Sequence, residues 1–109
     1  MLVGVEEGLS LEAVLGRAVE LEREYDWLGA AESYKKALGL VPKRDFSKMG
    51  EICERLGYAF YRAAMQAESQ EEFKERMQKA IEAYEKTHVF FEKLTNERRA
   101  ARVFRCDAV

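Results

Sequence analysis

The chain has little of three residue types that form reactive or metal-binding sites or that break helices. Its 109 residues include one proline, one histidine and two cysteines. Cys53 and Cys106 lie far apart and belong to no Cys-x-x-Cys or Cys/His pattern of the kind that holds zinc or exchanges disulfides. We therefore predict no metal, no cofactor and a reducing, cytoplasmic setting.

The scarcity of histidine also argues against an enzyme. His88 is the only histidine, and nothing in the sequence orients it as the base of a Ser-His-Asp set. A carboxylate-bridged di-iron bundle needs two Glu-x-x-His motifs, which a chain with one histidine does not contain. Glu92 lies one helical turn beyond His88, but two ligands on an exposed helix do not make a metal site. We predict that the chain is not an enzyme.

Long apolar runs and an excess of one charge are missing as well. The formal net charge is −2, without the clustered basic surface that nucleic-acid binding normally needs. The opening segment, MLVGVEEGL, has neither a basic flank nor a long apolar run, so it predicts no signal peptide and no membrane span. The charge is nevertheless uneven, because residues 98–105 contain four arginines and no acidic residue. We predict no nucleic-acid partner and no membrane partner.

The residues that are abundant favour helix. The chain is 48% hydrophobic and 35% charged, with long stretches of Ala, Glu, Lys, Leu and Arg, which are good helix formers. Its apolar residues recur at three- and four-residue spacing, as amphipathic helices require. Ser10 and Asp26 are predicted N-caps, and Ser69 followed by Glu72 is a predicted capping box. We predict one all-α domain over residues 1–109, with helices over residues 11–24, 27–40, 45–67, 70–94 and 97–107.

The segment from Asp26 to Pro42, DWLGAAESYKKALGLVP, carries the clearest motif. Bulky and small residues recur in it at fixed spacing, namely Trp27, Ala30, Tyr34, Ala37 and Pro42. This pattern resembles the second helix of a tetratricopeptide repeat. A second unit, about ten residues longer than the usual period of about 34 residues, repeats the pattern less closely with Leu56, Gly57, Tyr61, Met77, Ala80, Tyr84 and Thr87.

The resemblance implies a right-handed superhelix of antiparallel helix hairpins, with about five helices in all. The first repeat would span residues 11–42, and the extended second repeat would span residues 47–94. Thr95 and Asn96 are the predicted break before a lone fifth helix over residues 97–107. A repeat stack usually ends in a polar capping helix, so an uncapped fifth helix is expected to expose an apolar strip.

The resemblance also implies a role as a scaffold for protein–protein interaction. The first helices of the repeats would line a groove that binds a peptide or helix of a partner protein, and an acidic partner would suit its arginines. The expected contacts on this face are Leu15, Val19, Arg23, Glu54, Tyr58, Arg62, Arg98, Arg102 and Arg105. The last three recur at four- and three-residue spacing and would project together, which suits carboxylate binding. The alternative for them is a solvated helix face that pairs with nearby glutamates.

One ligand known for the family is not expected here. Tetratricopeptide domains that hold the acidic tails of chaperones use Lys and Asn side chains on successive inner helices, where this chain has Leu15, Val19, Glu54 and Tyr58. For Tyr58 itself, packing between helices is the alternative to ligand contact. Most other aromatic residues are predicted to lie in the core, namely Tyr25, Trp27, Tyr34, Phe60, Tyr61 and Tyr84.

A second hypothesis treats the chain as a structural dimerisation or adaptor segment, the N-terminal part of a larger multi-helix protein. The chain would then form a homodimer through an interface that buries Val103, Phe104 and either Phe90 or Phe91. A binding groove would instead leave four side chains exposed and close together, namely Tyr58, Arg62, Arg98 and Arg102. The two hypotheses therefore differ in which residues are covered.

Overall fold

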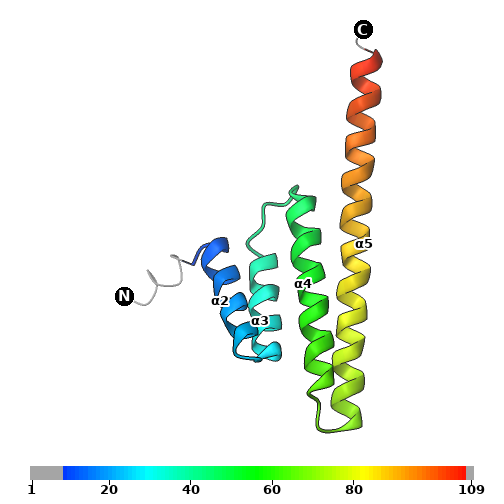
Figure 1. Cartoon of the computed structure of the whole chain (residues 1–109). Helices are drawn as coiled ribbons and strands as arrows, with labels where there is room; N and C mark the ends of the chain where they lie inside the picture. The colour runs from blue at the N-terminus through cyan, green and yellow to red at the C-terminus, as the bar shows by residue number, and fades with distance from the viewer. Residues whose placement is uncertain (1–8, 108–109) are drawn as a thin grey trace.

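The computed structural model describes the backbone of residues 9–107 and the side chains of residues 9–102. All regular secondary structure in this part of the chain is helical, which confirms the predicted all-α class. Four helices follow one another: α2 (Leu11–Arg23), α3 (Trp27–Leu38), α4 (Phe46–Met65) and α5 (Gln70–Asp107). Each helix packs against the next one along the chain, so that they form a row from α2 to α5 (Figure 1).

Short polar side chains begin the helices, as the sequence predicts. Ser10, Asp26 and Asp45 each accept a hydrogen bond from the backbone amide three residues on, at 2.9 to 3.1 Å. At the start of α5, Ser69 Oγ accepts the amide of Glu72, whose carboxylate accepts the amide of the residue before Ser69. These bonds satisfy donors that have no partner inside the helix. The caps predicted at Ser10, Asp26 and Ser69 are confirmed.

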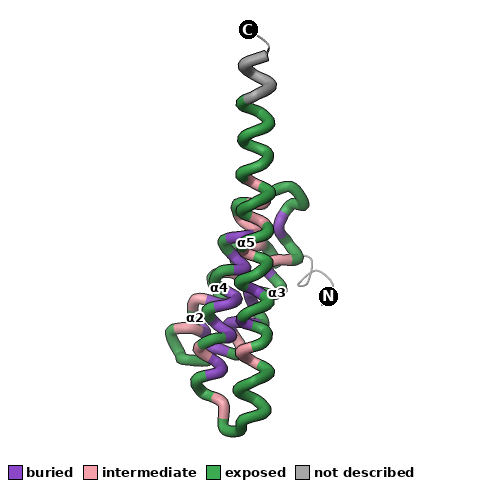
Figure 2. The backbone as a smooth tube through the Cα atoms, turned by 90° about the vertical axis from the view of Figure 1, so that its right-hand side faces the viewer, coloured by how far each residue is buried: buried purple, intermediate pink, exposed green. Residues whose placement is uncertain are grey.

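Small side chains let the helices approach one another closely. The alanines with no exposed surface are Ala18, Ala30, Ala31, Ala37, Ala59 and Ala63. Larger apolar residues fill the remaining core, including Val14, Leu21, Trp27, Tyr34, Ile52, Leu56 and Phe60. Figure 2 shows the buried stretches where the helices face one another, whereas the upper part of α5 is exposed.

Glycines set the contact between α4 and α5. A Cβ added at Gly50 would lie 2.7 Å from the ring of Phe91, and one added at Gly57 would lie 3.0 Å from the ring of Tyr84. Gly57 is seven residues after Gly50 in α4, whereas its partner Tyr84 is seven residues before Phe91 in α5. The two helices therefore pack in an antiparallel register. Glycine at these two positions leaves space for the two rings.

The predicted fifth helix is wrong. Thr95 and Asn96 lie inside one continuous helix, α5, of 38 residues. Thr and Asn are weak helix formers, but each costs only about 0.6 kcal/mol relative to alanine, and no glycine or proline follows them to end the helix. The last turns of α5 instead extend beyond the start of α4 (Figure 1), and residues 95–102 are exposed.

The turn between α2 and α3 contains a strained residue. Tyr25 has a left-handed backbone with φ of 62°, a conformation that costs an L-residue about 1 to 2 kcal/mol and costs glycine little. Its side chain is 69% exposed, so replacing it removes little packing. We expect Tyr25→Gly to raise the free energy of unfolding, measured in urea, by about 0.5 to 1 kcal/mol. Tyr25→Ala keeps the strained Cβ and is the control; an equal gain in both variants would contradict the explanation.

Candidate functional site

An arginine held between aromatic rings lies at the C-terminal half of α4. The Arg62 guanidinium is 4.8 Å from the centre of the Trp27 ring and 5.8 Å from that of Tyr58. Its Nη1 also donates a hydrogen bond to Tyr58 Oη at 2.8 Å. The two rings meet edge to face, with centroids 5.6 Å apart. Cation–π contacts and this hydrogen bond together hold the guanidinium in one position.

Local structure explains why these three residues meet. Tyr58 and Arg62 are one turn apart on α4, so they lie on the same side of that helix. Trp27 is the first residue of α3 and is 93% buried, with 7% of its surface exposed. Gln66, just after α4, donates a hydrogen bond at 3.0 Å to the carbonyl of Tyr25, which ties the end of α4 to the turn that leads into Trp27.

Two further tyrosines extend the group into what we call the aromatic cluster: Trp27, Tyr58, Tyr61, Arg62 and Tyr84. The ring centres of Tyr58 and Tyr61 are 6.3 Å apart, and Tyr84 reaches across from α5 over Gly57. The three tyrosines are 40 to 43% exposed. Burial, and after it the carboxylate of Glu54, raises the pKa of Tyr84. Its hydroxyl therefore remains a hydrogen-bond donor at neutral pH.

A separate hollow lies between α2 and α4. Leu15 and Val19, two of the predicted contacts, are half-buried and line this space of about 280 Å³. Tyr34 also lines it, and its hydroxyl donates to Glu22 at 2.7 Å and accepts from Arg55 at 3.3 Å. Burial and then the hydrogen bond to Glu22 raise the pKa of Tyr34. This network places a polar group beside an apolar wall.

The hollow and the aromatic cluster share one side of α4. Arg55 lines the hollow, and Tyr58 and Arg62 follow it at three- and four-residue spacing along the helix. Residues at these intervals lie on the same helix face. A ligand that crosses this face would therefore meet both features.

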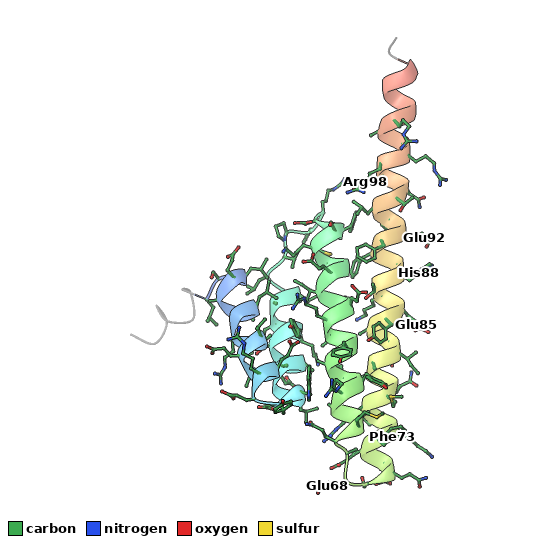
Figure 3. The ribbon with its side chains drawn as sticks, in the orientation of Figure 1. Glu68, Phe73, Glu85, His88, Glu92 and Arg98 are labelled. Carbon is green, nitrogen blue, oxygen red and sulfur yellow. The ribbon has the colours of Figure 1, made fainter. Side chains whose placement is uncertain are left out.

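Of the remaining predicted contacts, the structure brings only Glu54 close to this group, beside Tyr84. Arg23 is exposed at the end of α2. Arg98 and Arg102 are exposed on the part of α5 that extends past α4 (Figure 3). Arg98 is separated from Tyr84 by about 20 Å along the helix axis, at 1.5 Å per residue. The side chain of Arg105 lies outside the described residues, as do those of Val103 and Phe104.

The aromatic residues divide differently from the prediction. Trp27, Tyr34 and Phe60 are buried as predicted, whereas the predicted core positions of Tyr25, Tyr61 and Tyr84 are wrong, because these side chains are at least 40% exposed. The repeat pattern assigns Tyr61 and Tyr84 to helix packing. Tyr84 does pack against Gly57 of α4, but 41% of its surface stays exposed, and the sequence does not fix the register of α4 on α5 that decides this.

No three His, Cys, Asp or Glu side chains within the described residues are grouped so that they could hold a metal ion. His88 and Glu92 lie on the side of α5 away from α4 (Figure 3). Cys53 is a buried free cysteine, and burial raises the pKa of its thiol.

Comparisons with known proteins do not indicate a function, so a functional proposal depends on the geometry of the structure. No protein-family model matches the sequence, and the comparisons with curated proteins and with solved structures gave no match. Among the described residues, none of the helices combines the length and apolar composition needed to cross a membrane.

Proposed function

We propose that the protein is a tetratricopeptide-like interaction module, a right-handed superhelix of helix hairpins, whose aromatic cluster binds a peptide or helix of a partner protein in the cytoplasm. The observation that carries the proposal is the exposure of three tyrosines beside an arginine held over Trp27. Tyr, Trp and Arg are the residue types most enriched at the energetic centres of protein interfaces. Their concentration on one face supports a partner-binding role.

The cluster is also organised before any partner arrives. Arg62 is held by two rings and a hydrogen bond, so it loses little conformational freedom on binding, which favours affinity. Tyrosine has few rotatable bonds and offers both an apolar ring and a hydroxyl. The guanidinium keeps further N–H donors that suit carboxylates. These properties favour an acidic partner segment that also carries apolar or aromatic side chains.

The hollow between α2 and α4 gives the partner a second point of contact. Leu15 and Val19 provide an apolar wall there, where an apolar side chain of the partner would be buried. Ile52, which also lines the hollow, is about 15 Å along α4 from Arg62 at 1.5 Å per residue. A partner that reaches both features needs about five residues of extended chain at about 3.3 Å each.

The test is a peptide-display selection against the whole chain, followed by affinity measurements on single variants. We expect Tyr58→Ala and Arg62→Ala each to weaken binding of the selected peptides by at least tenfold, on the order of 1.4 kcal/mol or more, as at interface hot spots. Trp27 is the only tryptophan, so its fluorescence reports binding at the cluster directly. Arg17→Ala removes an exposed arginine of α2 outside the hollow and should leave affinity unchanged.

Two results would contradict the proposal. One is a set of selected peptides whose affinity does not change in Tyr58→Ala or Arg62→Ala. The other is a selection that enriches no peptide above an unrelated helical protein. Either would mean that the exposed aromatic residues do not form a binding surface.

Dimerisation is the second candidate function, and the exposed end of α5 over residues 95–102 favours it. The two candidates differ in solution mass. A dimerisation segment requires a mass that rises with concentration and returns to that of the monomer when residues 97–109 are removed. The peptide-binding module requires no such change. Light scattering on the whole chain and on the chain without residues 97–109 therefore distinguishes the two candidate functions.

A further inference from the structure

Three lysines form a row along α5. Lys79, Lys86 and Lys93 follow one another at intervals of seven residues, so they lie on one side of the helix. The Nζ of Lys79 is 5.6 Å from the centre of the Phe60 ring, and the Nζ of Lys93 is 5.5 Å from that of Phe46. Both ammonium groups therefore lie over aromatic rings of α4.

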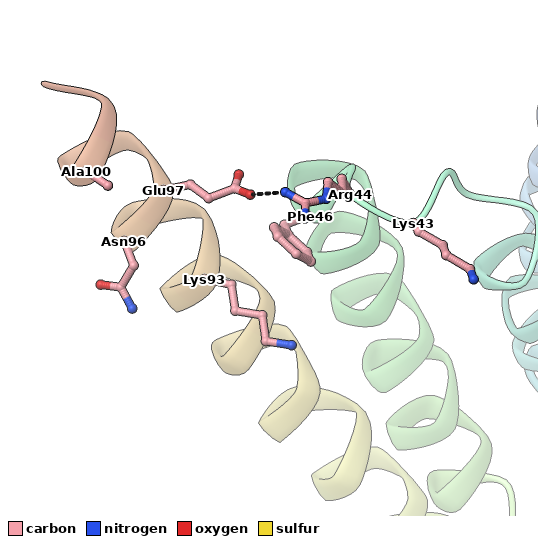
Figure 4. Close-up of a pocket in the computed structure, with 7 residues that line it drawn as sticks. All are labelled: Lys43, Arg44, Phe46, Lys93, Asn96, Glu97 and Ala100. Atoms are coloured by element: carbon pink, nitrogen blue, oxygen red, sulfur yellow. Dashed lines mark ion pairs between the residues drawn. The ribbon is translucent and has the colours of Figure 1, made fainter. Parts of the chain in front are cut away.

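Two hollows open along this row, and we call them together the basic groove. The first, of about 260 Å³, lies among α3, α4 and α5. The second, of about 610 Å³, lies between the segment that joins α3 to α4 and the upper part of α5 (Figure 4). Six basic side chains line the two hollows: Lys35, Lys43, Arg44, Lys79, Lys86 and Lys93.

The positive charge of the basic groove is poorly balanced. Only two carboxylates line it, those of Glu82 and Glu97. Among the described side chains, Arg44 alone of the six cations has an acidic partner, Glu97 at 3.9 Å (Figure 4), and that Arg44 side chain is 90% exposed. The whole chain has a net charge of −2, so this concentration of cations is local. Such a patch attracts a ligand of the opposite charge.

The floor of the groove is apolar. Leu38, Leu56 and Phe60 line the first hollow, and Phe46 lines the second. Phe60 and Leu56 are each two residues from Tyr58 in α4, a rotation of about 200° around the helix. The first hollow of the basic groove is therefore on the side of α4 opposite Tyr58.

We propose that the basic groove binds an acidic amphipathic helix of a partner protein. The apolar side chains of this partner helix occupy the hollow over Leu38, Leu56 and Phe60, and the carboxylates of the helix face the lysine row. The lining extends along α5 from Lys79 to Ala100, which is about 30 Å, the length of a helix of about 20 residues. Apolar anchors at helical spacing laid into a groove are a general mode of peptide recognition.

The apolar floor favours this occupant over a nucleic acid. Phosphates and sugars leave Leu38, Leu56 and Phe60 without apolar contacts, whereas leucine side chains of a helix cover them. An acidic amphipathic helix satisfies both the cations and the floor.

The test uses a labelled synthetic peptide of about 20 residues, made of leucine, alanine and glutamate with leucine at every third or fourth position. Binding to the whole chain is measured by fluorescence anisotropy. We expect the double variant Lys86→Glu with Lys93→Glu to weaken binding by at least about tenfold, because it replaces attraction by repulsion at two points. The control, Lys36→Glu with Lys74→Glu, makes the same change in net charge at exposed positions outside the groove and should change affinity less than about threefold.

Further comparisons decide the outcome. Tyr58→Ala should leave this binding unchanged, which separates it from the aromatic cluster. A polyglutamate peptide of equal charge should bind more weakly, because it has no apolar side chains. The proposal is overturned if both charge-reversed variants weaken binding equally, if polyglutamate binds as tightly, if oligouridylate binds more tightly through the same lysines, or if the peptide does not bind at about 1 mM.

Discussion

Replacing Ala80 with aspartate should lower the free energy of unfolding by at least about 3 kcal/mol, because it buries a charge without a partner between α4 and α5. Ala80 has 3% of its surface exposed and belongs to the core. A folded domain of this size is stable by only about 5 to 15 kcal/mol, so the variant should lose a large part of its stability. Urea denaturation followed by far-ultraviolet circular dichroism measures the change.

The control is the next residue along the same helix. Ile81 is the more hydrophobic of the two, yet it is 48% exposed. Ile81→Asp introduces the same charge on the same helix with a smaller loss of helix propensity, and it should cost only about 1 kcal/mol. If Ile81→Asp is as damaging as Ala80→Asp, the packing of α5 on α4 described above is wrong.

Removing the side chain of Tyr34 should be the most destabilising truncation, at about 3 to 5 kcal/mol for Tyr34→Ala. Tyr34 is among the largest side chains with no exposed surface, so alanine leaves a cavity. The same change removes the hydroxyl to which Glu22 and Arg55 are both hydrogen-bonded. Tyr34→Phe keeps the ring and removes only the hydroxyl, so it should cost about 1 kcal/mol. Equal losses in the two variants would show that the ring does not fill the core.

The same residue predicts a loss of stability at alkaline pH. Burial and the bond to Glu22 raise the pKa of Tyr34 above its ordinary value of 10.0. A group whose pKa is raised on folding binds its proton more tightly in the folded state, so its contribution is present below the unfolded pKa and is lost as pH rises through the folded one. The free energy of unfolding should therefore fall as the pH rises above about 10. Tyr34→Phe should show a shallower fall, although Tyr84 retains a contribution of the same sign.

The helices and their starts could be predicted because they depend on near neighbours. A side chain such as Asp26 reaches the amide three residues on whatever the rest of the chain does. The predicted break at Thr95 and Asn96 is wrong, because two weak helix formers do not end a helix. The sequence contains no glycine or proline after them that would end it.

The candidate site was predicted only in part. Tyr58 and Arg62 are one turn apart, so their meeting follows from helix geometry alone. Arg98 and Arg102 were expected to join them, but this required a fifth helix to fold back beside α4. Because α5 continues straight through residues 95–107, it carries both arginines away from the aromatic cluster.

The amino-acid sequence by itself determined the all-α class, the first helix boundaries and the apolar faces, since helix propensity, capping and periodicity act over a few residues. Tertiary structure alone decided which apolar residues are covered. Ala80 is buried and Ile81 beside it is exposed, because the antiparallel register of α4 on α5 places one of them between the helices. That register depends on contacts such as Gly57 with Tyr84, which join residues distant in the chain. The placement of Lys79 over Phe60 and of Lys93 over Phe46 also depends on this register.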